Sequence, residues 1–417
     1  MIPYTPSLIR TRSFNIALNL ARRGHAVTLA APWESAEDLE HQRRLGEEGI
    51  KILTARLTRS GVARNLLGAA ASDGPLQSAY SWSEDLFRQI AQALAVAPSP
   101  DAIHLEHLRS ARYGMALACL PSAGTGFPPV VWDSVDCISL LFERTLRFSH
   151  SALRRVIALL ELPRTRRWEG HLVRRFSRVL ATSQEDADAL ERLTRTGGRT
   201  GPSPSVTVIP NGVDLTFFSP GEAAREAEEI LLTGKMSYHA NVAAAVQLVR
   251  VIMPLVWASR PKVRVVLAGK SPTREVRDLE RTRPGFVTVT GTVPDLRPYL
   301  RRATAAVTPL VYGVGVQNKV LEAMACATPV IATPQAASPF AIASGQEIMI
   351  AETPEAFSAA ILKVLGDEPL RRRLGQNGRR YVEQHHDWGA MAGRLEEVYA
   401  AARRSSAMAV GEGTSGA

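Results

Sequence analysis

The chain of 417 residues alternates between short apolar runs and longer stretches with the apolar spacing of amphipathic helices. A run such as residues 263–268 is apolar at every position but one, which is typical of parallel strands covered on both faces. This alternation predicts an α/β fold with parallel sheets. The expected strands are residues 25–31, 50–55, 102–106, 129–133, 178–182 and 206–209 in the first half, and 230–233, 263–268, 287–290, 305–309, 329–333 and 347–350 in the second.

The beginning of the pattern is unusual. Residues 12–23 have helical spacing and Gly24 suits the C-cap, so a strand would be expected before this helix in a doubly wound sheet. Only residues 1–9 precede it, and Pro3 and Pro6 argue against a regular strand. We favour a missing first strand, through truncation or an upstream start codon, over a sheet that begins atypically.

A hinge is expected near the middle of the chain. Residues 209–214 contain the tight-turn pair Asn211 and Gly212, and Pro220 prevents a helix from continuing. The pattern predicts a first domain over residues 1–215 and a second over 216–384. A helix is expected at about residues 385–402, followed by a disordered tail at 403–417.

Composition narrows the classes of function. Cys119, Cys137 and Cys326 are scattered, so neither a disulfide framework nor a metal site is expected, and a reducing cytoplasm fits best. Neither a signal peptide nor a membrane-spanning apolar run is expected.

The formal net charge of +10 is concentrated in one segment. Ten arginines and two acidic residues lie between Arg144 and Arg178. This segment is either a surface for an anionic membrane or a solvated helical face in a chain that has 44 arginines and six lysines. Few aromatic residues are interleaved with the arginines, so we expect no nucleic acid as a partner.

The segment from Gly313 to residue 325 is the most informative. Its glycines follow an expected strand and precede a helix that begins near Asn318, a natural N-cap. Free N–H groups at such a helix start favour phosphate. Lys319 and Glu322 share a helical face, where the lysine suits phosphate and the carboxylate suits ribose hydroxyls. Alternatively, these two residues form only an ion pair.

A second lysine also follows an expected strand. Lys235 and Gly234 come directly after residues 230–233, and carboxyl ends of parallel strands are where ligands bind. A diphosphate needs at least one such cation. Alternatively, Lys235 is a solvated loop residue.

Taken together, three segments resemble glycosyltransferase family 4, which has the GT-B architecture. They are residues 209–220, residues 234–236 and residues 319–333, and the resemblance covers essentially the whole chain. It implies two Rossmann-like doubly wound domains that face a cleft. It also implies a first domain that binds the acceptor, a second that binds the nucleotide-sugar, and a last helix that packs back on the first domain. Within the family, the pattern is similar to bacterial sugar transferases of exopolysaccharide assembly.

The resemblance also assigns roles to residues. Glu322 would bind the donor ribose, while Lys235 and Lys319 would bind the diphosphate, without a metal or cofactor. The donor set implied is Gly234, Lys235, Asn241, Gly313, Gly315, Val316, Gln317, Asn318, Lys319 and Glu322. An N-terminal loop with Ser7, Arg10 and Arg12 would approach the phosphates. Retaining transfer is implied, although the family's second glutamate, eight positions before Glu322, is Val314 here.

Three residues of the first domain are catalytic candidates. His107 follows an expected strand and loosely matches a histidine near the reacting sugar in some relatives, but it is otherwise a surface residue or one paired with Glu106. Asp133 and Asp136 follow the next expected strand, where they would accept the proton of the nucleophile, bind sugar hydroxyls or cap a helix.

The sequence thus predicts a cytoplasmic glycosyltransferase, peripheral at the inner face of the plasma membrane. Its partners would be a nucleotide-sugar donor and a saccharide or polyprenyl-linked acceptor. The alternatives are a sugar-nucleotide epimerase on the same scaffold and a non-catalytic basic protein that binds membrane or nucleic acid.

Overall fold

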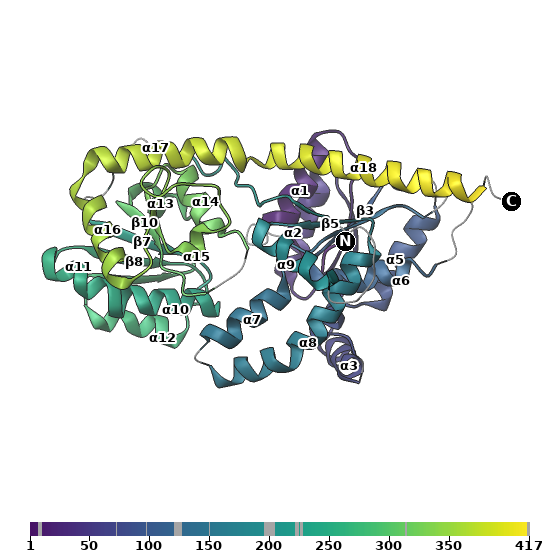
Figure 1. Cartoon of the computed structure of the whole chain (residues 1–417), viewed down its shortest axis with the longest axis horizontal. Coiled ribbons are helices and arrows are strands. Elements are labelled where there is room, and N and C mark those ends of the chain that lie inside the picture. Colours follow the sequence, from purple (N-terminus) through teal and green to yellow (C-terminus); the bar gives the residue numbers. More distant parts are fainter. Residues whose placement is uncertain are drawn as a thin grey trace. The chain divides into compact units, whose positions relative to one another are not determined.

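The computed structural model describes residues 1–6, 11–71, 73–96, 98–120, 127–149, 151–195, 205–221, 225, 228–312 and 315–414. The chain forms two compact units (Figure 1). The first comprises residues 1–210 and 388–417, and the second residues 211–387. Each unit consists of parallel strands covered by helices, as the alternating sequence pattern predicts.

The second unit is built on a six-stranded parallel sheet of order β12-β11-β10-β7-β8-β9. Its strands are β7 (Glu229–Thr233), β8 (Arg264–Ala268), β9 (Val287–Gly291), β10 (Ala305–Thr308), β11 (Val330–Ala332) and β12 (Met349–Ile350). Its helices are α10 (His239–Gln247), η1 (Leu248–Ile252), α11 (Met253–Ser259), α12 (Arg274–Asp278), η2 (Leu279–Thr282), α13 (Arg297–Arg302), α14 (Asn318–Ala325), α15 (Pro334–Ala337), α16 (Pro354–Gly366) and α17 (Glu368–His385).

Both faces of this sheet are apolar and buried. Along β7, Ile230 and Leu232 pack against α10, α11 and α16, whereas Leu231 packs on the opposite face against α13 and α14. Successive strand residues point to opposite faces, so a strand covered on both sides must be apolar throughout.

The helical stretch His239–Ser259 is long and apolar enough to cross a membrane by length and composition alone. The sequence pattern predicts no such stretch. Leu248, Ile252 and Met253 belong to the buried core of the second unit, so we assign the stretch as a core helix.

The first unit contains a four-stranded sheet, β3-β4-β5-β6, and a two-stranded sheet, β1-β2, all parallel. Its strands are β1 (Thr28–Trp33), β2 (Lys51–Arg56), β3 (Ile103–Glu106), β4 (Val130–Asp133), β5 (Arg178–Ala181) and β6 (Val206–Val208). Its helices are α1 (Thr11–Arg22), α2 (Ala36–Glu47), α3 (Arg59–Ala70), α4 (Leu76–Tyr80), α5 (Glu84–Ala95), α6 (His107–Leu117), α7 (Ile138–Phe148), α8 (Ala152–Arg175), α9 (Gln184–Arg195) and α18 (Trp388–Thr414).

Residues Met1 and Ile2 lie between the two sheets. The backbone N–H of Ile2 donates to Ala30 of β1, and the backbone oxygen of Met1 accepts from Glu106 of β3, each at 3.0 Å. This is the position of the strand that the sequence pattern lacks. Pro3 has no N–H to donate, which limits the pairing to these residues.

Helix α18 returns to the first unit, where Trp388, Met391 and Leu395 pack with Ile16 and Leu20 of α1. The sequence pattern predicts a disordered tail from residue 403, which is wrong as far as Thr414, because α18 continues to that residue. Five of the residues between positions 400 and 409 are alanine, which has the highest helix propensity.

Candidate functional site

The second unit has a topological switch point between β7 and β10. From β7 the sheet grows through β8 and β9 on one side, and β10 adds to the other side of β7. In open α/β sheets, ligands bind outside the carboxyl ends of the strands at this point. Gly234 and Lys235 follow β7, and the segment that leads into α14 follows β10. Both predicted lysine segments therefore meet at the same edge of the sheet.

Asn241, in the first turn of α10, joins these two segments. Its Nδ2 donates a 3.0 Å hydrogen bond to the backbone oxygen of Lys235, and its Oδ1 accepts one from Nζ of Lys319. Gly234 has φ +143°, and a Cβ there would lie 2.7 Å from Nδ2 of Asn241. The close approach therefore requires glycine. The side chain of Asn241 therefore bridges the ammonium of Lys319 and the loop that carries Lys235.

Lys319 and Glu322 are half-buried on α14. Burial lowers the pKa of Lys319 to about 8, and the charge of Glu322 opposes this shift. Burial raises the pKa of Glu322 to about 7, and the charge of Lys319 opposes that shift. Perturbed pKa values of this kind are concentrated at functional sites. The side chain of Lys235 is exposed.

The loop before α14 is described from Gly315 onward, and Gly313 lies outside the described residues. Gly315 has φ +71°, a conformation that glycine adopts without strain. Val316 packs in the core of the second unit. The sequence pattern predicts Asn318 as the N-cap, but the N-cap is Gln317 and Asn318 is the first helical residue. Oδ1 of Asn318 accepts a 3.1 Å hydrogen bond from Asn211, which holds the side chain away from the capping position.

In the first unit, His107 begins α6 directly after β3. It has φ +68°, which is strained for a residue other than glycine and is typical of functional positions. Burial and, to a lesser extent, the charge of Arg109 lower the pKa of His107 to about 3. His107 is therefore a neutral imidazole at the end of a strand.

Asp133 is a poorer candidate for a base than the sequence suggests. Its carboxylate has no exposed side-chain area and lies 2.7 Å from a guanidinium nitrogen of Arg12. Burial opposes ionisation, but the charge of Arg12 and the hydrogen bond with His104 outweigh it and lower the pKa of Asp133 to about 2. Arg12 was predicted to approach phosphates, but it is engaged in this buried pair. Ser7 and Arg10 lie outside the described residues.

Asp136 has the opposite character. It is half-buried, three residues after the end of β4. Burial and, to a lesser extent, the charge of Asp186 raise the pKa of Asp136 to about 7. Val135, which precedes it, has φ +65° although it is β-branched. A strained turn thus presents a carboxyl group whose pKa suits proton transfer at neutral pH.

Sequence reasoning missed a polar network beside these candidates. The hydroxyl of Tyr399 on α18 lies 3.0 Å from Nδ1 of His104, and Nε2 of His104 lies 3.4 Å from Asp133. Tyr4 donates a 3.1 Å hydrogen bond to Glu106. Burial raises the pKa of Glu106 to about 7, as does the charge of Asp133. No local pattern signals these contacts, because the partners are distant along the chain.

Comparison with known proteins follows the same division of the chain. The profile described as Glycosyltransferase Family 4 matches residues 9–217, half of the chain. The profile described as Glycosyl transferases group 1 matches residues 227–367. The chain belongs to glycosyltransferase family 4. Among the described residues, no group of three or more His, Cys, Asp or Glu side chains is placed to hold a metal ion.

Curated relatives align with part of this chain. An alpha-maltose-1-phosphate synthase of Mycolicibacterium smegmatis is 29% identical over 219 residues, which are 46% of this chain and 56% of the synthase. The lipopolysaccharide core biosynthesis mannosyltransferase LpcC of Rhizobium leguminosarum bv. viciae is 27% identical over 246 residues, 55% of this chain and 65% of that enzyme. The chain thus spans little more than half the length of the curated relatives it matches.

Solved structures share the GT-B fold over nearly the whole chain. The Anabaena protein HepE in complex with UDP-glucose has a TM-score of 0.65 at 15% identity and covers 96% of this chain and 99% of HepE. A sucrose-phosphate synthase from Thermosynechococcus elongatus has a TM-score of 0.65 at 20% identity and covers 92% and 90%. At these identities the likeness shows the fold.

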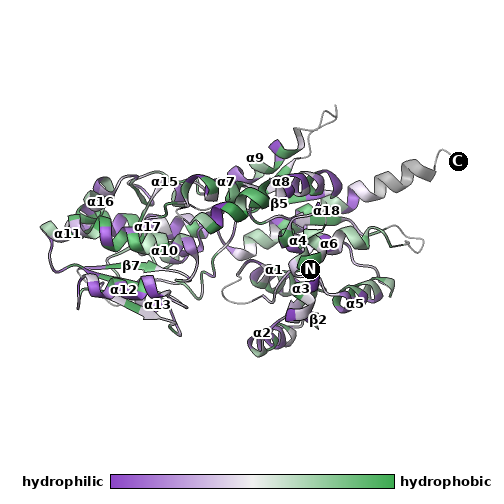
Figure 2. Cartoon of the chain, turned by 90° about the horizontal axis from the view of Figure 1, so that it is seen from below, coloured by the Kyte–Doolittle hydropathy of each residue, from purple (hydrophilic) through white to green (hydrophobic). Residues whose placement is uncertain are grey.

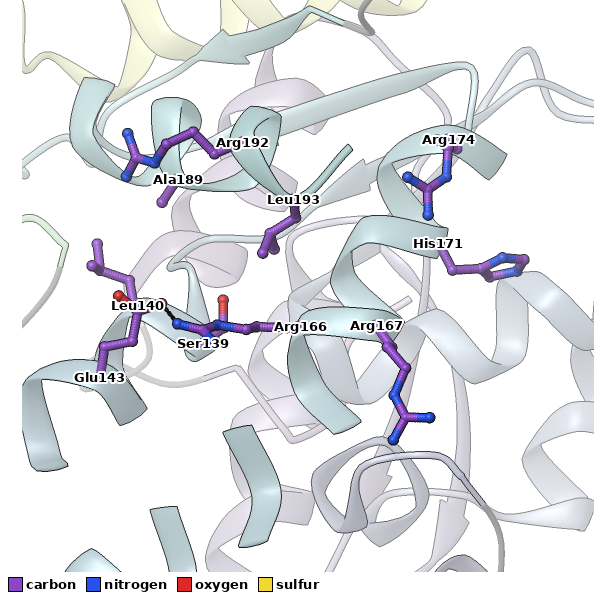
Figure 3. A pocket seen from close by; sticks show the side chains of 10 residues that line it. All are labelled: Ser139, Leu140, Glu143, Arg166, Arg167, His171, Arg174, Ala189, Arg192 and Leu193. Atoms are coloured by element: carbon purple, nitrogen blue, oxygen red, sulfur yellow. Dashed lines mark hydrogen bonds and ion pairs between the residues drawn. The ribbon is translucent and has the colours of Figure 1, made fainter. Parts of the chain in front are cut away.

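This family 4 chain also has an arginine-lined pocket of about 720 Å³ in the first unit (Figure 3). Helix α7 contributes Ser139 and Glu143, and α9 contributes Arg192. Its lining residues are Ser139, Leu140, Glu143, Arg166, Arg167, His171, Arg174, Ala189, Arg192 and Leu193. Arg166 pairs with Glu143 at 2.9 Å. The remaining arginines give the pocket a positive charge.

Proposed function

We propose that this protein is a glycosyltransferase that moves a sugar from a nucleotide-sugar donor to a saccharide or lipid-linked saccharide acceptor. The observation that carries the proposal is the hydrogen-bonded link from the Lys235 loop through Asn241 to Lys319, with Glu322 one helical turn further on. It combines cations for a diphosphate with a carboxylate for ribose hydroxyls, at the edge of the sheet where ligands bind. The named activities of the aligned relatives and the UDP-glucose complex of HepE support it.

In the proposed reaction, an acceptor hydroxyl bonds to the anomeric carbon of the sugar while the bond from that carbon to the diphosphate oxygen breaks. The diphosphate leaves with the electron pair, and Lys235 and Lys319 stabilise its charge. A base accepts the proton of the acceptor hydroxyl. Asp136 fits this role better than His107 or Asp133, because a base works best when its pKa lies near the working pH.

We propose that transfer is retaining, that it needs no metal, and that it serves bacterial exopolysaccharide or cell-surface glycan assembly in the cytoplasm. The lysines support metal independence, since they supply positive charge at the diphosphate. The arginine-lined pocket supports an anionic acceptor such as a polyprenyl diphosphate-linked saccharide. Its residue Ser139, in the first turn of α7, lies three positions after Asp136 in the chain.

Calorimetry of the purified protein with UDP, GDP and ADP tests the donor site. We expect one nucleotide to bind, and Glu322→Ala to weaken binding at least tenfold through the loss of charge-assisted hydrogen bonds. Glu355→Ala, on the exposed surface of α16, is the matched control and should bind as the unaltered protein does. If none of the nucleotides binds, the proposal fails.

Product analysis separates a transferase from an epimerase. Incubation of the nucleotide-sugar without acceptor should leave the donor sugar unchanged apart from slow hydrolysis. Interconversion of the donor would identify an epimerase instead. With acceptor, the anomeric configuration of the product by NMR tests retention, and EDTA should leave the rate unchanged.

A further inference from the structure

The first half of α8 exposes the wrong kind of side chain for a surface helix. From Ala152 to Leu160 only Ala158 is buried. Five large apolar residues in this stretch expose 47% to 70% of their surface to solvent. These residues are Leu153, Val156, Ile157, Leu159 and Leu160. A helix on the surface of a soluble protein normally turns its polar face to water.

The helical geometry places these residues on one side. Positions 153, 156, 157 and 160 follow the spacing of a single face, and position 159 borders it. Ala158, Glu161 and Leu162 are buried on the opposite side, and Glu161 accepts a 2.8 Å hydrogen bond from the backbone of Leu76. The apolar face, which comprises the five residues named above, therefore points away from the core of the unit. Figure 2 colours much of the α7–α8 pair as hydrophobic.

Cations border this face. Arg154 and Arg155 are exposed within the same stretch, and Arg147 is exposed at the end of α7. Between positions 144 and 160 the chain has four arginines and no acidic residue. An apolar face flanked by arginines has the composition of a helix that lies in a lipid headgroup region, where long cationic side chains reach the phosphates.

We propose that the apolar face of α8 inserts into the surface of an anionic lipid bilayer, with Arg147, Arg154 and Arg155 at the headgroups. A second copy of the chain is a poorer occupant. A twofold interface applies the same patch from both subunits, which would bring two cationic patches together. The charge is complementary to an anionic leaflet instead. The inference is independent of the transferase reaction, since it uses none of the donor-site residues.

The structure revises which residues would touch the membrane. Leu140 and Phe142 of α7 are also apolar and lie just before the arginine-rich segment 144–178. Both are half-buried and pack against the core of the first unit. Within the described residues of α7 and α8, only the first half of α8 presents a continuous apolar face.

Co-sedimentation of the full-length protein with vesicles tests the proposal. We expect binding to vesicles of phosphatidylcholine and phosphatidylglycerol, and little to phosphatidylcholine alone. Leu153→Ser with Ile157→Ser should weaken binding about tenfold, since two apolar side chains no longer enter the bilayer. Val251→Ser with Leu255→Ser, at exposed apolar positions of the second unit, is the matched control and should bind normally.

A charge variant tests the contribution of the arginines to membrane binding. Arg154→Ala with Arg155→Ala should weaken binding to the anionic vesicles about fivefold per arginine at low salt. The substituted side chains are exposed, so the thermal unfolding midpoint of each variant should stay unchanged. If Leu153→Ser with Ile157→Ser binds vesicles as the unaltered protein does, the proposal is wrong. It is equally wrong if light scattering shows that this variant turns a dimer into a monomer, because the face would then be a protein interface.

Discussion

Two residues of α14 set the expected pH dependence of donor binding. Glu322 binds ribose hydroxyls as a carboxylate, and its pKa is raised to about 7. Lys319 binds phosphate as an ammonium, and its pKa is lowered to about 8. Nucleotide affinity should therefore fall below about pH 7, where Glu322 is protonated, and above about pH 8, where Lys319 is neutral. Calorimetry across this range measures both limbs.

The substitution Lys319→Met sharpens that prediction. It removes the charge that lowers the pKa of Glu322, so the acid limb should move to higher pH while the alkaline limb disappears. An acid limb that stays in place would show that Glu322 does not contact the nucleotide.

Asp136 and His107 make different predictions for catalysis. Replacing a general base typically costs 10²–10⁴-fold in rate. Asp136→Asn should therefore lower kcat by about 100-fold or more and leave nucleotide affinity unchanged, because Asp136 belongs to the first unit and the nucleotide site to the second. His107→Asn should lower kcat less, since an imidazole whose pKa is about 3 is a weak base. The opposite order would assign the base to His107. Steady-state kinetics with the identified donor compares them.

Ala327 tests a backbone conformation. It lies in the turn between α14 and β11 with φ +52°, where an L-residue is strained. Ala327→Gly should raise the free energy of unfolding by about 0.5–1 kcal/mol. Ala359→Gly, at an exposed position within α16, is the matched control and should lower it by about 1 kcal/mol. Urea denaturation measures the free energy of unfolding of each variant. If Ala327→Gly lowers it as much as Ala359→Gly does, the turn is unstrained.

At the scale of elements, the buried pair of Arg12 and Asp133 connects α1 to β4. Arg12→Met leaves an uncompensated buried carboxylate, which should lower the free energy of unfolding by about 3–5 kcal/mol. Arg22→Met, on the same helix, removes a pair with Glu48 that is half-exposed and should cost less than about 1 kcal/mol. Urea denaturation compares the two variants. Equal losses would show that Arg12 contributes through its packing rather than its charge.

The elements were far more predictable than their contacts. The twelve strands in the described part of the chain all lie within a few residues of the expected runs, because a strand covered on both faces is marked by its own apolar sequence. The start of α14 was also expected, from the glycines before it. The sequence did not predict the pairing of Arg12 with Asp133 or the link from Asn241 to Lys319. Such contacts join residues far apart in sequence, and no local periodicity encodes them.

At the scale of the whole molecule, buried carboxyl groups in both units should make stability depend on pH. Burial raises the pKa of Glu106, Glu169 and Glu322 to about 7 each. The folded state therefore keeps protons that the unfolded chain releases near pH 4.5. The stability from these groups is full below about pH 4.5 and is lost as the pH rises through about 7.

The thermal unfolding midpoint should thus be higher at pH 5.5 than at pH 8, with a contribution of about 2 kcal/mol for each such carboxyl group. Glu169→Gln should flatten this dependence, because the amide does not ionise, and its oxygen can still accept the hydrogen bond from the backbone N–H of Ile138. Glu40→Gln is the control. Hydrogen bonds from Arg43 and Arg44 lower the pKa of Glu40 to about 2, so it titrates below this range and its loss should leave the slope intact. A midpoint that rises from pH 5.5 to pH 8 in the unaltered protein would mean that water or counter-ions reach these carboxylates, and that both units hold them ionised without penalty.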